Sequence, residues 1–432
     1  MKILEITAAE RMGGRIVVPG AKNSALALLA GACLSDAPVQ IRNVPDISDV
    51  GIVLQIIRDM GGSARREGHT VTVDGGGIRT PEILPEEAGK IRTAYYFVGA
   101  LLARFGKVSV GYAGGDDFTE RPIDQHFKGL RALGASIILY KDHYVVQAGR
   151  LKGAEIQFDT ITMGATINLM MAAVLAEGRT VLRNAARDPE VVDLAVMLNE
   201  MGAGIIGAGT ETIRIEGVMR LGTASHSVIP DRLVAAAFIT ALGTTGGRLV
   251  LDRAVPEHLA NLIGKYREIG YDFTTSPDKQ NLIAETDGCI LPTRVRAGMY
   301  PLFSTDYQQP LAALLLKAHG TSVVSDRVYP MRFNQCAEFI RMGASLRTRT
   351  GSVRIQGGRP LHGTHVHATD IRAGTALLIA GLLADGTTFL SGVEHLDRGF
   401  EDAAAMFSRI GAPVRMVEMD ASYAMPRREQ DG

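Results

Sequence analysis

The chain has 432 residues, with 46 basic and 46 acidic side chains, and its formal net charge at pH 7 is zero. This length exceeds what one ordinary hydrophobic core holds, so we expect two or three domains. A neutral chain has no overall field that attracts nucleic acid or an anionic membrane surface, so we expect neither as a partner.

The three cysteines, Cys33, Cys289 and Cys336, are odd in number and far apart in the sequence. This spacing argues against a disulfide framework and against CxxC metal sites, and it indicates a reducing compartment. The N-terminus lacks a basic segment followed by an apolar run, so we expect no signal peptide. The longest apolar runs stop at about a dozen residues, short of the roughly 20 that span a bilayer. We therefore expect a cytoplasmic protein.

A repeat organises the whole chain. At six places a hydrophobic residue and a glycine close an amphipathic segment, and the glycines are Gly61, Gly134, Gly202, Gly270, Gly343 and Gly411. The last three follow the first three at a constant separation of 209 residues (270 − 61, 343 − 134 and 411 − 202). This periodicity predicts two similar halves, each built from three units of about 70 residues.

Each unit repeats the same order of predicted elements. A very apolar helix comes first, then a strand such as 179–185, then an amphipathic helix such as 121–134 that ends at the repeat glycine. Alternating strands such as 212–217 close most units. In chain order the apolar helices are expected at 25–34, 93–106, 166–178, 233–243, 311–320 and 374–386. Helices that are apolar on nearly every face must be enclosed, which excludes a simple Rossmann fold, where helices cover a sheet from outside.

The apolar helices begin with polar residues, and some of these are cations. Ser, Thr, Asp and Asn at these starts are ordinary helix N-caps. A cation there is different, because the helix dipole disfavours positive charge at an N-terminus. Lys22, Arg92 and Arg372 make sense at helix starts if they and the free N–H groups face a bound anion, such as a phosphate or carboxylate.

The loop at 111–127 has two open interpretations. Pro122 suits the first turn of the following helix, and Arg121 just before it can reach an anion at that terminus. Gly114 and Gly115 allow the loop to bend. The alternative is an acidic surface turn in solvent. Two other motifs are discounted: GAGIIG at 202–207 runs from helix to strand, the reverse of a dinucleotide fingerprint, and HGTHVH at 362–367 lacks further metal ligands.

An ordered set of motifs resembles one family over nearly the whole chain. The motifs lie at 18–31, 121–135, 184–203, 228–232, 304–309, 331–344, 368–388 and 395–402. Together they resemble the UDP-N-acetylglucosamine 1-carboxyvinyltransferases, a family of enolpyruvyl transferases in the EPSP synthase superfamily. The resemblance implies an α/β fold of two inverted barrels, each of three βαβαββ repeats, with the active site in the cleft between them. It divides the chain into residues 22–229, with a mobile loop at 111–122, and a second domain of 1–21 plus 230–432.

The resemblance also implies a reaction. The sugar 3-hydroxyl of UDP-N-acetylglucosamine attacks C2 of phosphoenolpyruvate while C3 is protonated, and the resulting tetrahedral ketal loses phosphate, in the first committed step of peptidoglycan precursor synthesis. This chemistry needs cations for a trianionic substrate, a base near the hydroxyl, an acid near C3 and exclusion of water. No cofactor and no metal ion is implied.

By position in the family, two groups of residues carry this reaction. The expected catalytic residues are Lys22, Asp116, Asp306 and Arg398. The expected substrate-binding residues are Asn23, Arg92, Arg121, Pro122, Ile123, Asp124, Thr162, Met163, Gly164, Val328, Arg332, Asp370 and Arg372.

The chain departs from the family at several positions, and two of them bear directly on the chemistry. Asp116 stands where the family commonly has a loop cysteine, which is the group that fosfomycin alkylates. A carboxylic acid can donate a proton but is a far weaker nucleophile, so we expect activity that is insensitive to fosfomycin. Thr160 replaces a lysine near the nucleotide phosphates, which should weaken binding of that group. A transferase acting on another nucleotide such as UMP, and a catalytically silent ligand-binding paralogue, are therefore the alternatives.

Overall fold

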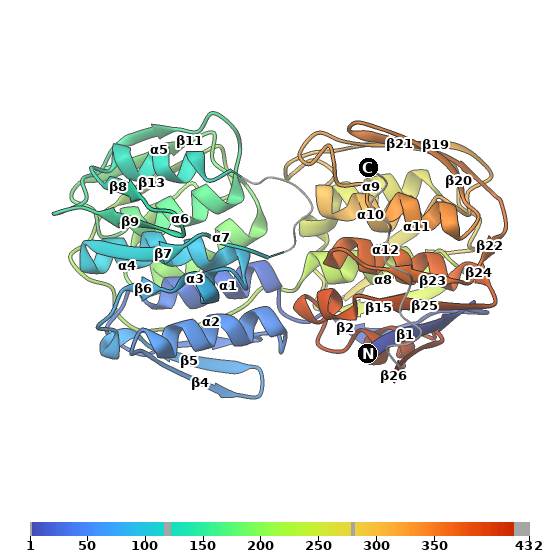
Figure 1. The fold of residues 1–432 in the computed structure, drawn as a ribbon, viewed down its shortest axis with the longest axis horizontal. Coiled ribbons are helices and arrows are strands. Elements are labelled where there is room, and N and C mark those ends of the chain that lie inside the picture. Colours follow the sequence, from blue (N-terminus) through green and yellow to red (C-terminus); the bar gives the residue numbers. More distant parts are fainter. Residues whose placement is uncertain (1, 116–121, 278–280, 419–432) are drawn as a thin grey trace. The chain divides into compact units, whose positions relative to one another are not determined.

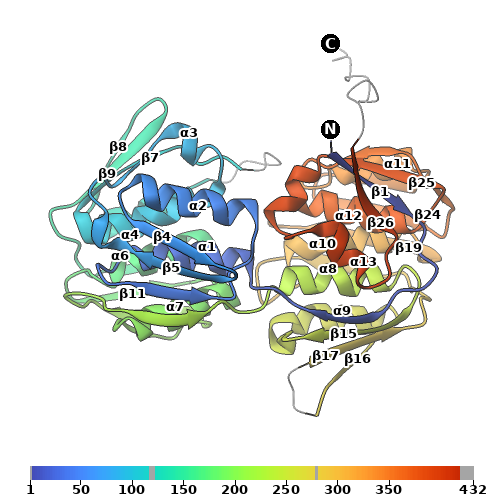
Figure 2. The same cartoon turned by 90° about the horizontal axis from the view of Figure 1, so that it is seen from below.

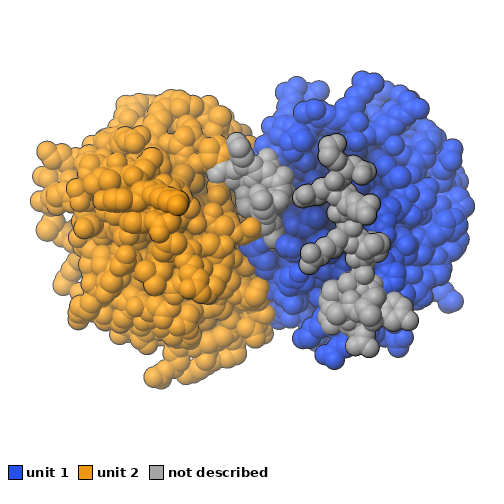
Figure 3. Space-filling view, in the orientation of Figure 1, with its two compact units in different colours: residues 1–18, 232–298, 302–432 blue, residues 19–231, 299–301 orange. Residues whose placement is uncertain are grey.

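The computed structural model describes residues 2–115, 122–277 and 281–418. The chain forms two compact units: unit 1 comprises residues 1–18, 232–298 and 302–432, and unit 2 comprises residues 19–231 and 299–301 (Figure 3). Each unit has its own hydrophobic core. The chain passes between the units at 18/19, 231/232, 298/299 and 301/302. The first two crossings lie close to the domain boundaries that the sequence predicts at 21/22 and 229/230. The assignment of each unit as an enolpyruvyl transferase domain stays a prediction.

Within its described residues, unit 2 contains three four-stranded sheets (Figure 1). In spatial order the first holds β14 (Ala224–Ser227), β3 (Val39–Arg42), β5 (Thr70–Asp74) and β4 (Ser63–Glu67). The second holds β6 (Glu82–Ile83), β7 (Lys107–Gly111), β9 (His143–Gln147) and β8 (Ser136–Leu139). The third holds β10 (Glu155–Gln157), β11 (Arg179–Arg183), β13 (Thr212–Glu216) and β12 (Gly204–Ile206).

The described part of unit 1 repeats this arrangement. Its sheets hold β2 (Gly14–Val17), β15 (Gly247–Asp252), β17 (Asn281–Thr286) and β16 (Asp272–Thr275); β18 (Arg294–Ala297), β19 (Gly320–Asp326), β21 (Ser352–Gly357) and β20 (Ser345–Arg349); and β23 (His365–His367), β25 (Thr387–Ser391), β1 (Lys2–Thr7) and β26 (Val414–Glu418). Two short strands, β22 (Leu361–His362) and β24 (Ala384–Asp385), form a separate two-stranded sheet in the same unit. In each four-stranded sheet of both units the first pair is parallel and the other two pairs are antiparallel.

Each unit encloses three apolar helices, which we call the inner helices. They are α1 (Lys22–Ala32), α4 (Tyr96–Phe105) and α6 (Met163–Ala173) in unit 2, and α8 (Arg232–Leu242), α10 (Thr305–Leu314) and α12 (Ile371–Leu382) in unit 1. Every residue of α8 and of α12 is buried. The sheets and the outer helices surround them (Figures 1 and 2). The expected pair of inverted α/β barrels, each of three βαβαββ repeats, is thereby confirmed.

The outer helices carry the repeat glycines. These helices are α2 (Ser48–Asp59), α5 (Asp124–Ala132), α7 (Pro189–Glu200), α9 (Ala260–Glu268), α11 (Gln335–Arg341) and α13 (Ala403–Ser408). All six repeat glycines have φ between 88° and 106°. This is the left-handed conformation that ends a helix, and a side chain disfavours it, which is why the repeat keeps glycine there. The short helices are α3 (Pro85–Ala88), η1 (Gly75–Gly77), η2 (Arg92–Tyr95), η3 (Pro256–Leu259) and η4 (Val393–Arg398).

Strands from distant parts of the chain complete three of the sheets. β1 lies between β25 and β26, with Leu4 opposite Leu390, so the N-terminal strand belongs to the last sheet of unit 1 (Figure 2). β2 pairs with β15, and β14 pairs with β3. Among the described residues, no helix combines the length and apolar character needed to cross a membrane.

Candidate active site

The three inner helices of unit 1 place charged side chains at their first turns. Arg232 is the first residue of α8, Asp306 lies in the first turn of α10, and Arg372 lies in the first turn of α12. Ser304 caps α10, since its hydroxyl accepts from the Asp306 N–H at 3.3 Å. Asp370 caps α12 by accepting from the Arg372 N–H at 2.9 Å. These caps satisfy backbone donors and fix the direction in which the charged side chains leave the helices.

A network of ion pairs joins the starts of α10 and α12. Asp306 Oδ1 accepts from Arg332 Nη1 at 2.9 Å and from Arg372 Nε at 3.2 Å. Arg332 Nη2 also donates to Asp370 Oδ1 at 3.2 Å. Arg332 and Asp370 are buried, whereas the Asp306 side chain is 25% exposed. Asp306 is therefore the carboxylate of this network that a substrate can reach.

The charges of the network favour an anionic ligand. Burial raises the pKa of Asp306, but the charges of Arg372 and Arg332, helped by that of Arg232, outweigh burial and hold its pKa well below the usual range. Asp306 is therefore ionised at neutral pH. The guanidinium groups of Arg332 and Arg372 lie against Asp306, and the N-termini of α10 and α12 add positive potential beside them.

Two further expected residues of unit 1 lie near these elements in the fold. Val328 is held by its backbone, because its N–H donates to Asp326 Oδ1 at 2.8 Å. Arg398 is the last residue of η4, which packs against α12, the helix that carries Arg372. Both side chains are half-buried.

In unit 2, Lys22 is the first residue of α1. Its side chain and its backbone bind different partners. Its Nζ lies 2.7 Å from Asp49 Oδ2, and its backbone N–H donates to Asp231 Oδ2 at 3.0 Å. The lysine side chain is 14% exposed and that of Asp49 is 2% exposed. Asn23 follows on the same turn and is half-buried. An ammonium group at the start of a buried helix is suited to an anion, as the sequence predicts.

A second group in unit 2 surrounds the first turn of α6. The Arg92 guanidinium lies over the Tyr95 ring at 5.5 Å, and that ring lies 4.6 Å from the His126 ring. Gly164 lies against both rings, since a Cβ there would come within 2.8 Å of the Tyr95 hydroxyl and 3.2 Å of His126 Nε2. Arg92, expected near phosphoenolpyruvate, and Gly164, expected at the nucleotide, thus both lie against Tyr95.

His126 is neutral in this position. Burial, together with the charge of Arg92 and against the opposing effect of Asp124, lowers its pKa to about 3. Asn168 Oδ1 accepts from the Gly99 N–H at 2.6 Å, so its amide Nδ2 is the group that faces His126 Nδ1 at 2.9 Å. Because that amide is a donor, Nδ1 accepts and Nε2 carries the proton.

The segments 122–124 and 162–164, both expected to bind the nucleotide, are linked through Gln125. Gln125 Nε2 donates to Asp159 Oδ2 at 3.0 Å, and the Asp159 N–H donates to Gln125 Oε1 at 2.9 Å. Thr162 caps α6, its hydroxyl accepting from the Ala165 N–H at 3.4 Å, with Met163 as the first residue of that helix. The sequence prediction for Pro122 was wrong by two residues: α5 begins at Asp124 after the N-cap Ile123, whose backbone is not helical. Asp116 and Arg121 lie outside the described residues.

Sequence reasoning missed three residues of these groups. Asp49 sits in the first turn of α2 and looks like an ordinary helix-dipole acid. His126 has no motif of its own, and Arg232 was noted only as part of a helix start. The resemblance named their neighbours, and only the folded structure brings these side chains to them. The described residues hold no group of three or more His, Cys, Asp and Glu side chains placed to bind a metal ion.

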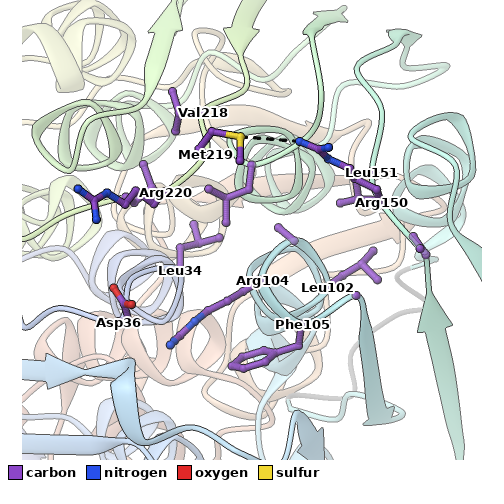
Figure 4. Close-up of a pocket in the computed structure, with 16 residues that line it drawn as sticks. Leu34, Asp36, Leu102, Arg104, Phe105, Arg150, Leu151, Val218, Met219 and Arg220 are labelled. Atoms are coloured by element: carbon purple, nitrogen blue, oxygen red, sulfur yellow. Dashed lines mark hydrogen bonds between the residues drawn. The ribbon is translucent and has the colours of Figure 1, made fainter.

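A cavity of about 500 Å³ in unit 2 lies elsewhere (Figure 4). It is lined by Leu34, Arg104 and Leu175, which stand at or just beyond the C-terminal ends of α1, α4 and α6. Arg104 Nη1 donates to the Cys33, Ser35 and Gly75 carbonyls at 2.9 to 3.0 Å, so it caps the end of α1. Lys22 begins the other end of α1, so this cavity is distinct from the expected substrate site.

Comparisons with known proteins agree with these findings. A sequence model of the EPSP synthase (3-phosphoshikimate 1-carboxyvinyltransferase) family matches residues 6–406. The chain is 44% identical over 414 residues to UDP-N-acetylglucosamine 1-carboxyvinyltransferase 2 of Geobacillus kaustophilus (strain HTA426), covering 96% of each chain. It is 41% identical to the protein of the same name from Bacillus subtilis (strain 168), again over 96% of each.

A solved structure is also similar. The enolpyruvyl transferase NikO from Streptomyces tendae matches with a TM-score of 0.87 and 25% identity, covering 96% of this chain and 98% of that one. EPSP synthase from Acinetobacter baumannii matches in fold alone, with a TM-score of 0.72 and 19% identity over 97% of this chain and all of that one. With residues 6–406 matched and relatives above 40% identical over nearly the full length, the chain belongs to the EPSP synthase (3-phosphoshikimate 1-carboxyvinyltransferase) family.

Proposed function

We propose that the protein transfers the enolpyruvyl group of phosphoenolpyruvate to the 3-hydroxyl of UDP-N-acetylglucosamine and releases phosphate. One observation carries the proposal: Asp306, ionised and partly exposed at the start of α10, accepts from Arg332 and from Arg372, which lies at the start of α12. The relatives above 40% identity bear this activity in their names. A cytoplasmic location goes with the proposal, and the three cysteines, all within the described residues, are unpaired.

Cations hold the trianionic substrate in this proposal. Lys22, Arg121 and Arg398 bind phosphoenolpyruvate, and Arg92, Arg332 and Arg372 assist them. Buried guanidinium and ammonium groups at helix N-termini bind phosphate and carboxylate strongly, because water competes poorly with them there. The expected residues in the segments 122–124 and 162–164 hold the uridine nucleotide.

Asp306 acts as the base. With its pKa so far depressed it is a weak proton acceptor while both arginines donate to it. An anionic substrate that draws these arginines away raises the pKa of Asp306, so the base strengthens only when phosphoenolpyruvate is bound. The sugar O3 then loses its proton to Asp306 as the bond from O3 to C2 forms, and Asp116 gives a proton to C3. In the second step C3 loses a proton, the bond between C2 and the phosphate oxygen breaks, and phosphate leaves.

A second candidate acceptor is a nucleotide without the sugar diphosphate, such as UMP. Thr160 favours it, since this exposed side chain brings no positive charge to the nucleotide phosphates. The nearby cation, Lys128, lies with its Nζ 2.5 Å from Asp159 and is partly neutralised by it. When a cation is missing from the site, a diphosphate loses more binding free energy than a monophosphate does.

Release of inorganic phosphate from phosphoenolpyruvate tests these readings. UDP-N-acetylglucosamine, UMP and no acceptor are supplied in parallel, and a new enolpyruvyl ether in the product is identified by mass spectrometry. Turnover with UDP-N-acetylglucosamine supports the proposal, and turnover with UMP alone supports the second candidate. Binding of phosphoenolpyruvate without turnover on any nucleotide indicates a silent ligand-binding paralogue and overturns both.

A further inference from the structure

A buried carboxylate behind the first turn of α1 plays no part in the reaction just described. Asp193 on α7 is 4% exposed, and its Oδ2 accepts a hydrogen bond from the hydroxyl of Ser24, which is fully buried on α1. Its Oδ1 faces His226 Nε2 at 2.7 Å, and His226, on β14, is 7% exposed. Ser24 and Asp193 are 169 residues apart in the sequence. One carboxylate thus joins three elements of unit 2.

These three side chains do not form a hydrolytic triad. In a Ser–His–Asp triad the imidazole stands between the hydroxyl and the carboxylate and takes the hydroxyl proton. Here the carboxylate stands in the middle, and Ser24 donates directly to it. Ser24 is also fully buried, so no substrate reaches its oxygen. The group holds structure in place and has no nucleophile.

Asp193 ties together the two stretches of chain by which unit 2 begins and ends. Besides Ser24, its Oδ2 accepts from the Ile229 N–H at 3.3 Å. Next to this contact the stretches 19–22 and 229–231 bond to each other: the Ala21 N–H donates to the Ile229 carbonyl at 2.7 Å, and the Asp231 N–H donates to the Pro19 carbonyl at 2.8 Å. Asp231 in turn accepts from the Lys22 N–H. The backbone of Lys22 is thus fixed by partners that Asp193 holds.

His226 supports Asp193 from the other side. Its Nδ1 faces Glu200 Oε1 at 3.1 Å, and Glu200 lies on α7 seven residues after Asp193, on the same face of the helix. Burial lowers the pKa of His226, but the hydrogen bonds and charges of Asp193 and Glu200 outweigh burial and raise it overall. An imidazole between two carboxylates carries its proton more readily, and its charge offsets that of Asp193 in the core.

We propose that Asp193, supported by His226, is a positioning residue for Lys22. Asp193 positions Lys22 by anchoring Ser24 and Ile229. The first turn of α1 then holds the ammonium group of Lys22 in the direction needed for an anionic substrate. This inference rests on the proposed function of Lys22 as a ligand of phosphoenolpyruvate. A displacement of about 1 Å in a positioned group can cost up to about a hundredfold in rate or affinity, so loosening this anchor should be measurable.

Four variants and a matched control test the inference. Ser24→Ala and Asp193→Asn weaken the anchor, His226→Leu removes its support, and His226→Gln keeps an amide donor near the position of Nε2. Ser35→Ala is the control: Ser35 is buried just beyond the other end of α1, where its hydroxyl donates to the Leu221 carbonyl at 3.1 Å. Each protein is assayed for kcat, for the KM of both substrates, for thermal unfolding and for hydrogen–deuterium exchange of residues 19–26.

We expect Ser24→Ala, Asp193→Asn and His226→Leu to raise the KM for phosphoenolpyruvate about tenfold or more, with kcat and the acceptor KM changed by less than about threefold. Exchange of residues 19–26 should rise in the same variants. His226→Gln should restore the KM for phosphoenolpyruvate. Ser35→Ala should lower the unfolding temperature with neither effect. If the anchor variants resemble Ser35→Ala, with lower unfolding temperature and unchanged KM and exchange, the inference is wrong.

A failure of the proposed function gives a different result. In that case the wild-type protein releases no phosphate with UDP-N-acetylglucosamine, and binding of phosphoenolpyruvate is measured by titration calorimetry instead. A dissociation constant about tenfold higher in Ser24→Ala than in Ser35→Ala then supports the anchor. Equal dissociation constants for these two variants, or no binding by the wild type, overturn it.

Discussion

Lys22 and Asp49 form an ion pair with 2.7 Å between Nζ and Oδ2, at the first turn of a helix whose remaining residues are almost all buried. The carboxylate is almost fully enclosed, while the lysine side chain is 14% exposed. Asp49 therefore stabilises the charge of Lys22 from inside the unit. We therefore expect a separation of roles, in which Lys22 binds the substrate and Asp49 balances its charge.

Replacing Lys22 tests that separation. Lys22→Met should lower stability by about 1 to 3 kcal/mol, since the carboxylate of Asp49 loses its cation in the core. Adding Asp49→Asn should recover most of this loss, because the remaining charge is removed, yet it should not recover activity. Chemical unfolding and steady-state kinetics of the single and double variants measure both effects.

Lys317→Met is the matched control for this pair. Lys317 is another partly buried lysine, in unit 1, and its Nζ donates to the Thr244 carbonyl at 2.9 Å. Its replacement should cost stability without changing the KM for phosphoenolpyruvate. Recovery of activity in the Lys22→Met, Asp49→Asn double variant would show that Lys22 does not bind substrate.

Asp306→Asn separates the base from the anion site. We expect kcat to fall by about 10² or more, because the proton acceptor is lost. The affinity for phosphoenolpyruvate should stay equal or increase, since Arg332 and Arg372 lose a competing carboxylate. Kinetics measure kcat, and calorimetry measures the affinity for phosphoenolpyruvate. The control is Asp252→Asn, because the carboxylate of Asp252 pairs with Arg15 in unit 1. Weaker binding of phosphoenolpyruvate with unchanged kcat would assign Asp306 to substrate holding instead.

The acid dependence of stability follows from the same contacts. The pKa of Asp306 is lowered in the folded state, so its ion pairs stabilise the protein above the unfolded value of about 3.9 and lose this effect as pH falls through the folded pKa. The wild type should therefore lose its stability advantage over Asp306→Asn only below about pH 4. An advantage that disappears near pH 6 would contradict the depressed pKa.

His226 gives a stability change with the opposite sign. Its pKa is raised in the folded state, so the protonated ring stabilises the protein fully below the unfolded pKa of about 6.5, and this contribution disappears as pH rises through the folded pKa. The groups that produce the shift are Asp193 and Glu200. Thermal unfolding of the wild type and of His226→Gln between pH 5 and about pH 9 should show a difference that is largest on the acid side. A difference that grows toward alkaline pH would mean that the ring is held neutral.

Asp116 predicts the response to fosfomycin. It lies outside the described residues, and its role as proton donor to C3 rests on its position in the sequence. The wild type should remain active and unmodified with fosfomycin, whereas Asp116→Cys should be inactivated with one covalent adduct, because a thiolate is a far stronger nucleophile than a carboxylate. Mass spectrometry of the intact chain measures the adduct. A stoichiometric adduct on the wild type, or full activity in Asp116→Ala, would remove Asp116 from the mechanism.

The repeat made much of the fold predictable from the sequence. Gly61 and Gly270 occupy the same place in the two halves because each ends an outer helix in a left-handed conformation. This requirement is local, so it is visible in the sequence as a repeated glycine. The pairing of Leu4 with Leu390 is not visible in the sequence. The register between two strands so far apart in the chain depends on the assembled core.

The site was predictable where a cation begins an apolar helix or where a family motif contains the residue. Asp306 and Arg372 stand in motifs, and the structure brings them into contact as expected residues of one site. Asp193 and His226 stand at ordinary-looking positions on a helix and a strand, and only folding places Asp193 between Ser24 and His226. A buried polar network of this kind is invisible in a single sequence, because no spacing rule relates its members.

Enolpyruvyl transfer to UDP-N-acetylglucosamine is tested most directly by measuring phosphate release from phosphoenolpyruvate with the wild-type protein. UDP-N-acetylglucosamine and UMP are supplied as acceptors in parallel. We predict turnover with UDP-N-acetylglucosamine, an enolpyruvyl ether at its 3-hydroxyl, and loss of both in Asp306→Asn. Phosphate release that requires UMP and ignores UDP-N-acetylglucosamine, or that persists unchanged in Asp306→Asn, would contradict the account.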